Sequence, residues 1–373
     1  GRIVSMGRDV AIPATARVID GQGQHAWPGL VALGTGLGLY EIGQVGATVD
    51  SSEIGGNHPD VRVTASLNAE SAHIPVTRSN GITRAQVAPQ GGGPMRGQSA
   101  IIRLEGDTWE ELTMVDRDQL HVSFPRTRND AKEKTKKSEA VEELERLLEE
   151  ARDYERLRVE ARTHGSTPPP YEPRLEALVP YALGQKRVAL RVDNAQTILN
   201  ALRFAREQEL DCVLYGVREG WKVAEAIAES GLPAVVGPVL TTPSSEFDPY
   251  DSAYANAAVL VRAGVPVSIM ADDSENTRNL AFHAAMACAF GLPHEEAVRA
   301  ITYYPAQVLG LESELGSLAP GKRADVVLTD GDLLEVKSRV TAMFIDGRSV
   351  SLQNRQTRFY DRYRSRLLRL QGK

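Results

Sequence analysis

Cysteine, histidine and long apolar runs are scarce in this chain of 373 residues. The two cysteines, Cys212 and Cys288, lie inside apolar stretches, which excludes a disulfide framework or a thiolate zinc site and predicts two core residues. No apolar run is long enough to cross a bilayer, so we expect no membrane span. The formal charge of −6 argues against a nucleic-acid partner.

A starting methionine is also missing, because the chain begins Gly1-Arg2. We expect the beginning of a longer product to have been removed, which leaves the cellular compartment undetermined. At the other end, arginines recur from Arg362 to Arg369. Residues 351–373 are therefore expected to form a helical tail with a solvated basic face.

Apolar runs followed by helical patterns fill the middle of the chain. Four such runs are residues 188–192, 212–217, 234–239 and 265–271. This alternation predicts parallel strands with crossover helices, and the length favours a closed barrel over an open sheet. We therefore predict an α/β fold with a (β/α)8 TIM-type barrel over residues 30–311.

Short β-type runs separated by turns occur at both chain ends. They are residues 2–5, 16–20, 324–329 and 340–345, the last followed by the hairpin signal Asp346-Gly347. We predict that residues 1–29 and 312–350 form one small β-sandwich. In that arrangement Val18-Ile19 lies beside Val326-Val327.

A highly charged segment at about residues 129–162 interrupts the barrel pattern. Val141, Leu144, Leu148 and Ala151 recur in it at helical spacing, and Ser138 is a suitable N-cap. We predict a helical excursion with one buried stripe on the surface of the barrel. A lid or an interface is the alternative interpretation of this segment.

Two long stretches near the C-terminal end carry a family resemblance. Residues 302–310 read TYYPAQVLG, and residues 316–327 read GSLAPGKRADVV. Together they resemble the amidohydrolase superfamily, near imidazolonepropionases and dipeptidase-like enzymes. The resemblance implies a metal-dependent hydrolase of carbon–nitrogen bonds other than peptide bonds, with a barrel and a small β-sandwich.

The histidines that bind metal in that family are replaced in this chain. Alternate residues of a strand point the same way, so a His-x-His pair at the end of strand one can bind one ion. The matching positions here are Gly34-Thr35-Gly36, and the ends of strands five and six carry Asp193 and Tyr215. A phosphate-binding glycine loop is the alternative for the glycines, but the motif spacing and a following lysine are missing.

The resemblance retains one acidic position, Asp272 at the end of strand eight. It implies that Asp272 is the general base if the protein is active. Further pocket candidates, beside Gly34, Gly36, Asp193 and Tyr215, are Lys222, Asp273, Arg278 and His283. Carboxylates that meet without a cation repel, so we expect a basic partner such as Arg191, Arg278 or Lys222.

The 7 histidines all lie away from the matching strand ends, and we expect structural or surface roles for them. His283 is the one that could approach the barrel mouth.

Three functions remain open from the sequence. The first is a degenerate homologue without metal, a pseudoenzyme that serves as a structural or regulatory subunit in a homo-oligomer or beside an active paralogue. The second is an active hydrolase of an amide, cyclic amide or dipeptide-like substrate with a rebuilt site, for which zinc would be the cofactor. The third is a barrel that binds a small molecule at its mouth without changing it. No cofactor is expected under the first and third.

Overall fold

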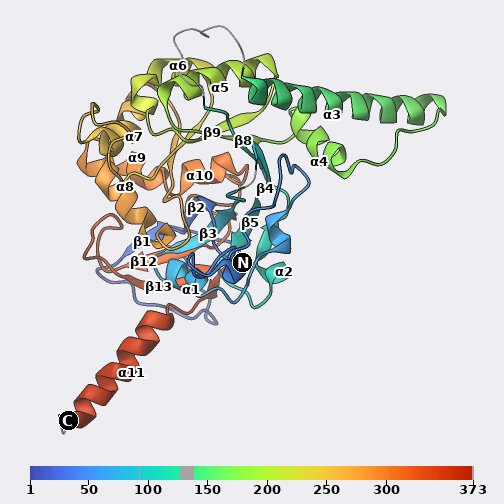
Figure 1. Cartoon of the computed structure of the whole chain (residues 1–373). Coiled ribbons are helices and arrows are strands. Elements are labelled where there is room, and N and C mark those ends of the chain that lie inside the picture. The colour runs from blue at the N-terminus through green and yellow to red at the C-terminus, as the bar shows by residue number, and fades with distance from the viewer. Residues whose placement is uncertain (92, 127–137, 372–373) are drawn as a thin grey trace.

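The computed structural model describes residues 1–91, 93–126 and 138–371, and most of them form an α/β barrel (Figure 1). Parallel strands supply most of the wall: β2 pairs with β3, and β7 to β11 follow one another in a second sheet. The strands are β2 (Leu30–Thr35), β3 (Ile82–Val87), β4 (Met95–Gln98), β5 (Ala100–Arg103), β6 (Thr113–Val115), β7 (Leu120–Ser123), β8 (Val188–Val192), β9 (Cys212–Gly216), β10 (Ala234–Val236) and β11 (Val267–Ile269).

A bent segment, β4 and β5, joins the two barrel sheets. β4 pairs with β7 and β5 pairs with β3, both in the antiparallel sense. Ser99 separates the two halves and holds the corner: its amide donates to the carbonyl of Gln119 (2.9 Å), and its carbonyl accepts from the amide of Asp118 (2.7 Å). The barrel wall therefore contains one bent segment, β4 with β5, that runs antiparallel to the strands on either side.

The first and last barrel strands meet through a turn. The amide of Val31 in β2 donates to the carbonyl of Ile301 (3.0 Å), and the amide of Ile269 in β11 donates to the carbonyl of Ala300 (2.8 Å). These two carbonyls satisfy the open edges of both strands. The predicted fold class, an α/β barrel of TIM type with a small β domain from both chain ends, is confirmed.

Helices cover the outside of the barrel. They are α1 (His73–Arg78), α2 (Trp109–Leu112), α3 (Glu139–His164), α4 (Pro173–Ala182), α5 (Ala195–Glu207), α6 (Ala224–Ser230), α7 (Ser252–Arg262), α8 (Leu280–Ala289), α9 (His294–Arg299) and α10 (Tyr303–Val308). In α5, Asn194 caps the start by accepting a hydrogen bond from the amide of Thr197 (2.9 Å), and Ile198, Ala201 and Phe204 bury one face. In the described part of the chain, no helix has the length and apolarity needed to cross a membrane.

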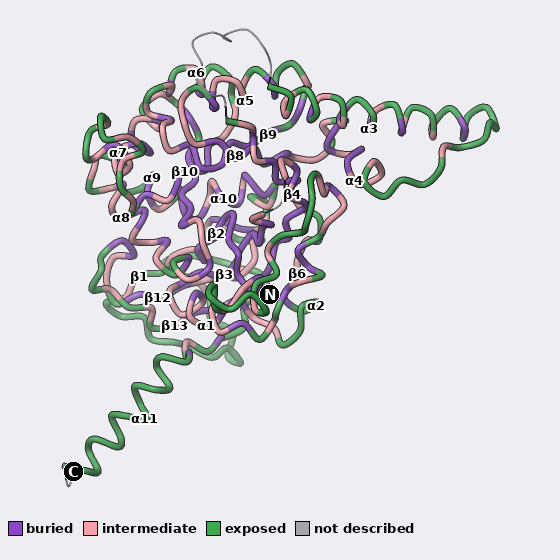
Figure 2. Tube along the Cα trace, in the orientation of Figure 1, coloured by how far each residue is buried: buried purple, intermediate pink, exposed green. Residues whose placement is uncertain are grey.

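Two helices project from this body in different directions (Figure 1). α3 packs on α4 and buries Leu144, Leu148, Ala151 and Tyr154, while the remainder of the predicted excursion, residues 129–137, lies outside the described residues. α11 (Arg355–Leu370) has no buried residue and is exposed along its length, as Figure 2 shows. The barrel strands, in contrast, are almost continuously buried, as expected for a parallel sheet covered on its faces.

The small sheet draws on both chain ends. Its order is β1-β12-β13-β14, from β1 (His25–Pro28), β12 (Val326–Thr329), β13 (Val340–Ile345) and β14 (Arg348–Ser349). The strands predicted at residues 2–5 and 16–20 do not form: Arg2 makes a single bridge to Arg323, and Val18 and Ile19 are exposed. Trp27-Pro28, not Val18-Ile19, pairs with Val326-Val327. The reason is that β1 and β13 occupy the two edges of β12, which leaves no edge for the earlier residues.

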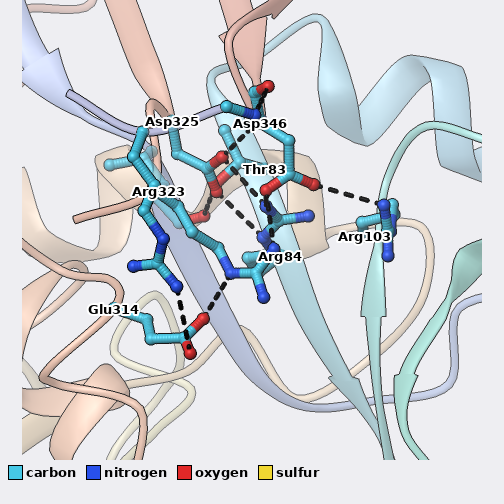
Figure 3. A network of polar contacts seen from close by, with 10 residues as sticks. Thr83, Arg84, Arg103, Glu314, Arg323, Asp325 and Asp346 are labelled. Carbon is cyan, nitrogen blue, oxygen red and sulfur yellow. Dashed lines mark hydrogen bonds and ion pairs between the residues drawn. The ribbon is translucent and has the colours of Figure 1, made fainter. Parts of the chain in front are cut away.

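A fully buried arginine ties the small sheet to the barrel (Figure 3). Arg84 of β3 places Nη2 at 2.9 Å from Asp325 Oδ1 and at 2.9 Å from Asp346 Oδ1. Its Nε lies 2.8 Å from Asp325 Oδ2, a close ionic contact whose geometry is too poor for a hydrogen bond. Asp325 is the acidic residue of the GKRAD signature, so this part of the resemblance reports a structural ion pair.

Replacing Arg84 by methionine should unfold the protein much more easily, because it leaves the buried carboxylate of Asp325 without its cation, whereas Asp346 keeps Arg103 and Arg323. We expect a loss of about 3–5 kcal/mol in the free energy of unfolding, measured by urea denaturation. Arg146→Met is the matched control, since Arg146 forms an exposed ion pair on α3 and should cost about 0.5 kcal/mol or less. Similar losses in the two variants would contradict the role assigned to Arg84.

Candidate functional site

A polar cavity of about 210 Å³ opens at the C-terminal ends of the barrel strands. The residues that line it come from β2, β4, β7, β8 and β9 and from the loops after β3 and β11: Gly34, Ala88, Pro89, Gln90, Arg96, His121, Val122, Arg191, Tyr215 and Asp272. In barrels of this kind the strand ends converge on the mouth, which makes this cavity the candidate site.

An ion pair between Arg191 and Asp272 occupies the mouth. Arg191 Nη2 donates to Asp272 Oδ2 across the barrel, from the end of β8 to the residues after β11. Asp272 has a φ of 68°, a left-handed conformation that side chains other than glycine seldom adopt. The carboxylate therefore has a fixed direction and a guanidinium partner.

Arg96 of β4 lines the same cavity without a partner of its own. Among the described residues, it forms no hydrogen bond or ion pair, and its Nε is buried and unsatisfied. Burial, together with the charge of Arg191, lowers the pKa of Arg96, but a guanidinium remains charged at neutral pH. This half-buried guanidinium is attracted by the charges of Asp272 and Asp193 but is bonded to neither, so it marks a place where an anion would be stabilised.

His121 of β7 lies buried beside Tyr215, with ring centroids 5.5 Å apart in an edge-on arrangement. Burial, with the charges of Arg96 and Arg191, lowers the pKa of His121 to about 3, so the ring is neutral at physiological pH. Its Nε2 has no hydrogen-bond partner among the described residues. The ring thus adds a free polar atom beside the guanidiniums.

Tyr215 is anchored from below. Its hydroxyl lies 2.9 Å from Gln86 Oε1 and 3.1 Å from Gln119 Oε1, and Gln86 Nε2 donates to Asp118 Oδ2 (2.7 Å). Burial raises the pKa of Asp118 to about 6 and that of Tyr215 well above its ordinary value. Tyr215 is therefore a fixed, protonated floor of the cavity.

The structure places three of the predicted site residues in the cavity lining: Gly34, Tyr215 and Asp272. Gly36 lies behind it, where an added Cβ would be 2.7 Å from Gln90 Nε2. Asp193 lies outside the lining and pairs with the exposed Arg126 (2.8 Å).

Four other candidates lie outside the cavity lining: Lys222, Asp273, Arg278 and His283. Lys222 pairs with Asp248 (2.6 Å) and Glu219 (3.1 Å), and Asp273 accepts from Asn276. Arg278 lines a separate surface pocket near β13 and α11.

His283 is a structural residue. Its Nδ1 accepts from the amides of Val239 (3.1 Å) and Leu240 (3.4 Å), and burial lowers its pKa to about 4. A neutral ring with this role holds the loop after β10 and is not available to a ligand.

His121 and Arg96 are the residues that sequence reasoning missed. His121 stands second in a four-residue strand, so no strand end marks it. Arg96 belongs to the antiparallel strand β4, which the alternation of parallel strands and helices in the sequence does not predict. A positive charge within the short strand β4, beside Met95 and Gly97, is the one available signal.

The residues at the mouth do not fit a zinc ion. Zinc sites need three or more nitrogen, oxygen or sulfur ligands, and no group of three His, Cys, Asp or Glu side chains meets that need in the described residues. Histidine cannot simply return to Gly34, whose φ is 63°, or to Gly36, whose surroundings are crowded. Two guanidiniums would also repel a divalent cation there.

Comparison with known proteins was made on the sequence and on the fold. A family model described as "Amidohydrolase family" matches residues 132–350. An imidazolonepropionase of Shouchella clausii is 34% identical over 115 residues, which is 28% of this chain and 23% of that protein. One from Thermoplasma volcanium is 38% identical over 85 residues, 22% of this chain and 21% of that protein. The chain thus spans less than a quarter of the length of these relatives.

Among solved structures, an amidohydrolase from Thermotoga maritima has a TM-score of 0.85 at 25% identity, covering 94% of this chain and 93% of that one. A molinate hydrolase has a TM-score of 0.53 at 17% identity, covering 94% of this chain and 89% of that one, and shows the fold alone.

Acid should weaken the fold through His121. Its pKa is about 3 in the folded chain and about 6.5 unfolded, so the unfolded state binds the extra proton and stability falls as pH drops below 6.5. Between pH 7 and pH 5, His121→Gln should lose about 1–2 kcal/mol less free energy of unfolding than the unmodified chain. His164→Gln, at an exposed helix end, should follow the unmodified chain. Parallel curves for all three would refute the assignment.

Proposed function

Because the chain belongs to the amidohydrolase family, we propose that it is a degenerate member whose barrel mouth binds a small molecule without metal-assisted hydrolysis. The observation that carries this proposal is the ion pair between Arg191 and Asp272. In relatives the position of Asp272 binds metal and receives a proton from the attacking water. Here its carboxylate is directed at a permanent cation of the protein itself.

The electrostatics of the mouth support the same conclusion. A metal in this family polarises a bond and lowers the pKa of a bound water, which needs anionic or neutral ligands around it. The cavity instead offers Arg96 and Arg191 against the single carboxylate of Asp272. The neutral His121 is one imidazole, too few for a zinc ligand set.

An active hydrolase with a rebuilt site is the second candidate, because a cavity of ligand size still adjoins Asp272. The substrate would be an amide, a cyclic amide or a dipeptide-like compound. For Asp272 to act as a general base, Arg191 would have to release the carboxylate when the substrate enters.

Metal analysis decides between these candidates. We expect the purified chain to contain well below one zinc ion per molecule, and added zinc to leave its melting temperature unchanged. Asp272→Asn should leave zinc content unchanged as well, since the carboxylate holds a guanidinium. Hydrolysis that a chelator abolishes and zinc restores would overturn the degenerate assignment.

A regulatory or structural subunit also needs a partner, and we include self-association or pairing with an active relative in the proposal. Phe359, Tyr363 and Leu367 recur at helical spacing on the projecting α11 and are exposed. Leu157 and Val159 are exposed on α3.

We expect sedimentation of the purified chain at micromolar concentration to show a dimer or a larger assembly. Leu367→Ser should weaken an assembly that uses α11, with no change in the barrel, because Leu367 touches no core residue. A monomer at all concentrations would remove self-association from the proposal and leave only the pairing with a relative.

A further inference from the structure

We propose that the ligand of the barrel mouth is a small organic monocarboxylate, held between the guanidiniums of Arg96 and Arg191. This inference deepens the proposed function and rests on it in one respect: the mouth must be free of metal. Its basis is the charge, the unsatisfied donors and the size of the cavity.

The charges that line the cavity leave one positive charge uncompensated. Arg96 and Arg191 carry two, and Asp272 neutralises one of them. At the rim, Asp193 attracts both guanidiniums and is itself paired with Arg126, so three arginines face the two carboxylates of Asp193 and Asp272. His121 adds no charge, because burial, and then the charges of Arg96 and Arg191, lower its pKa to about 3.

The unsatisfied donors favour a carboxylate. A guanidinium presents its donors in a planar fork that matches the two oxygens of a carboxylate. Arg96 has no partner within the described residues, and Arg191 spends Nη2 on Asp272. A carboxylate between them would satisfy Arg96 and complete the neutralisation of the mouth.

Charge also separates a carboxylate from a phosphate group. One uncompensated positive charge matches a monoanion. A phosphate dianion would bring an extra negative charge next to Asp272, where like charges in a poorly solvated cavity repel strongly. Inorganic phosphate is therefore the discriminating competitor.

The space and the remaining polar atoms set the ligand's size and its second group. A cavity of about 210 Å³ holds an acid of a few carbon atoms, given about 30 Å³ for a water molecule in the liquid. The unsatisfied Nε2 of His121 and the Gln90 side chain face the same space. They suit a neutral amide or hydroxyl group on the acid.

Calorimetric titration of the full chain with propionate, propionamide and inorganic phosphate tests the inference. We expect saturable binding of propionate, none of propionamide and weaker binding of phosphate. Arg96→Gln should weaken propionate binding about tenfold to a hundredfold, since it removes a charged hydrogen-bond partner. Arg146→Gln should bind as the unmodified chain does, because Arg146 is exposed on α3 and lies outside the cavity lining.

A second measurement needs no variant. Arginine modification by phenylglyoxal, read by mass spectrometry, should be slowed at Arg96 by propionate but not by propionamide, and should be unaffected at Arg146. Equal protection by the two compounds, or an Arg96→Gln chain that binds propionate normally, would overturn the inference.

The two proposals fail in different ways. Propionate binding that a chelator abolishes would mean that a metal holds the carboxylate, which overturns both the metal-free mouth and the arginine site. No binding of propionate to a chain shown to be free of metal would overturn the arginine site alone.

Discussion

The buried arginine of β3 is the constraint on which the rest of the architecture depends. Arg84 is fully enclosed, and within the described residues its ion-pair partners are Asp325 and Asp346, which adjoin β12 and β13 of the small sheet. Leaving either side alone would strand charge in a medium that solvates it poorly, so the barrel and the small sheet must form together. The backbone repeats the link, since the amide of Asp346 donates to Asp325 Oδ1 (2.9 Å). The two parts are one cooperative unit because of this network.

Buried arginine charges are compensated differently at the two ends of the barrel. At the Arg84 end, the buried guanidinium pairs with Asp325 and Asp346, and Asp346 also pairs with Arg103 and Arg323. At the mouth, Arg191 has Asp272, but Arg96 has none among the described residues. The first arrangement stabilises the fold, and the second leaves free energy available to a ligand. The residues that hold the barrel to the small sheet are thus not those at the mouth, so the frame does not depend on which side chains line the cavity.

Sequence patterns predicted the parts of this fold that rest on local physics. Residues 188–192 and 212–217 were identifiable as strands because a strand that is buried on both faces has a nearly unbroken apolar sequence. The antiparallel strands β4 and β5 could not be identified in this way, because Arg96 and Gly97 interrupt the apolar run. The bend at Ser99 also depends on hydrogen-bond partners further along the chain. Among the site residues, Asp272 and Tyr215 followed from the resemblance. His121 and Arg96 did not, because convergence of side chains is a property of the closed barrel and not of any segment.

The turn at Ala300 and Ile301 closes the barrel, because it links the first strand, β2, to the last, β11. Val31, near the start of the chain, is satisfied by Ile301, and Ile269 by Ala300, so the ring cannot close until that turn is in place. During synthesis, the outer edge of β2 would stay open while the rest of the barrel is made. Contacts of such long sequence separation slow folding and expose strand edges to wrong pairing. Most strands of this barrel thus pair with strands close to them in sequence, but closure of the ring is among the latest events in folding.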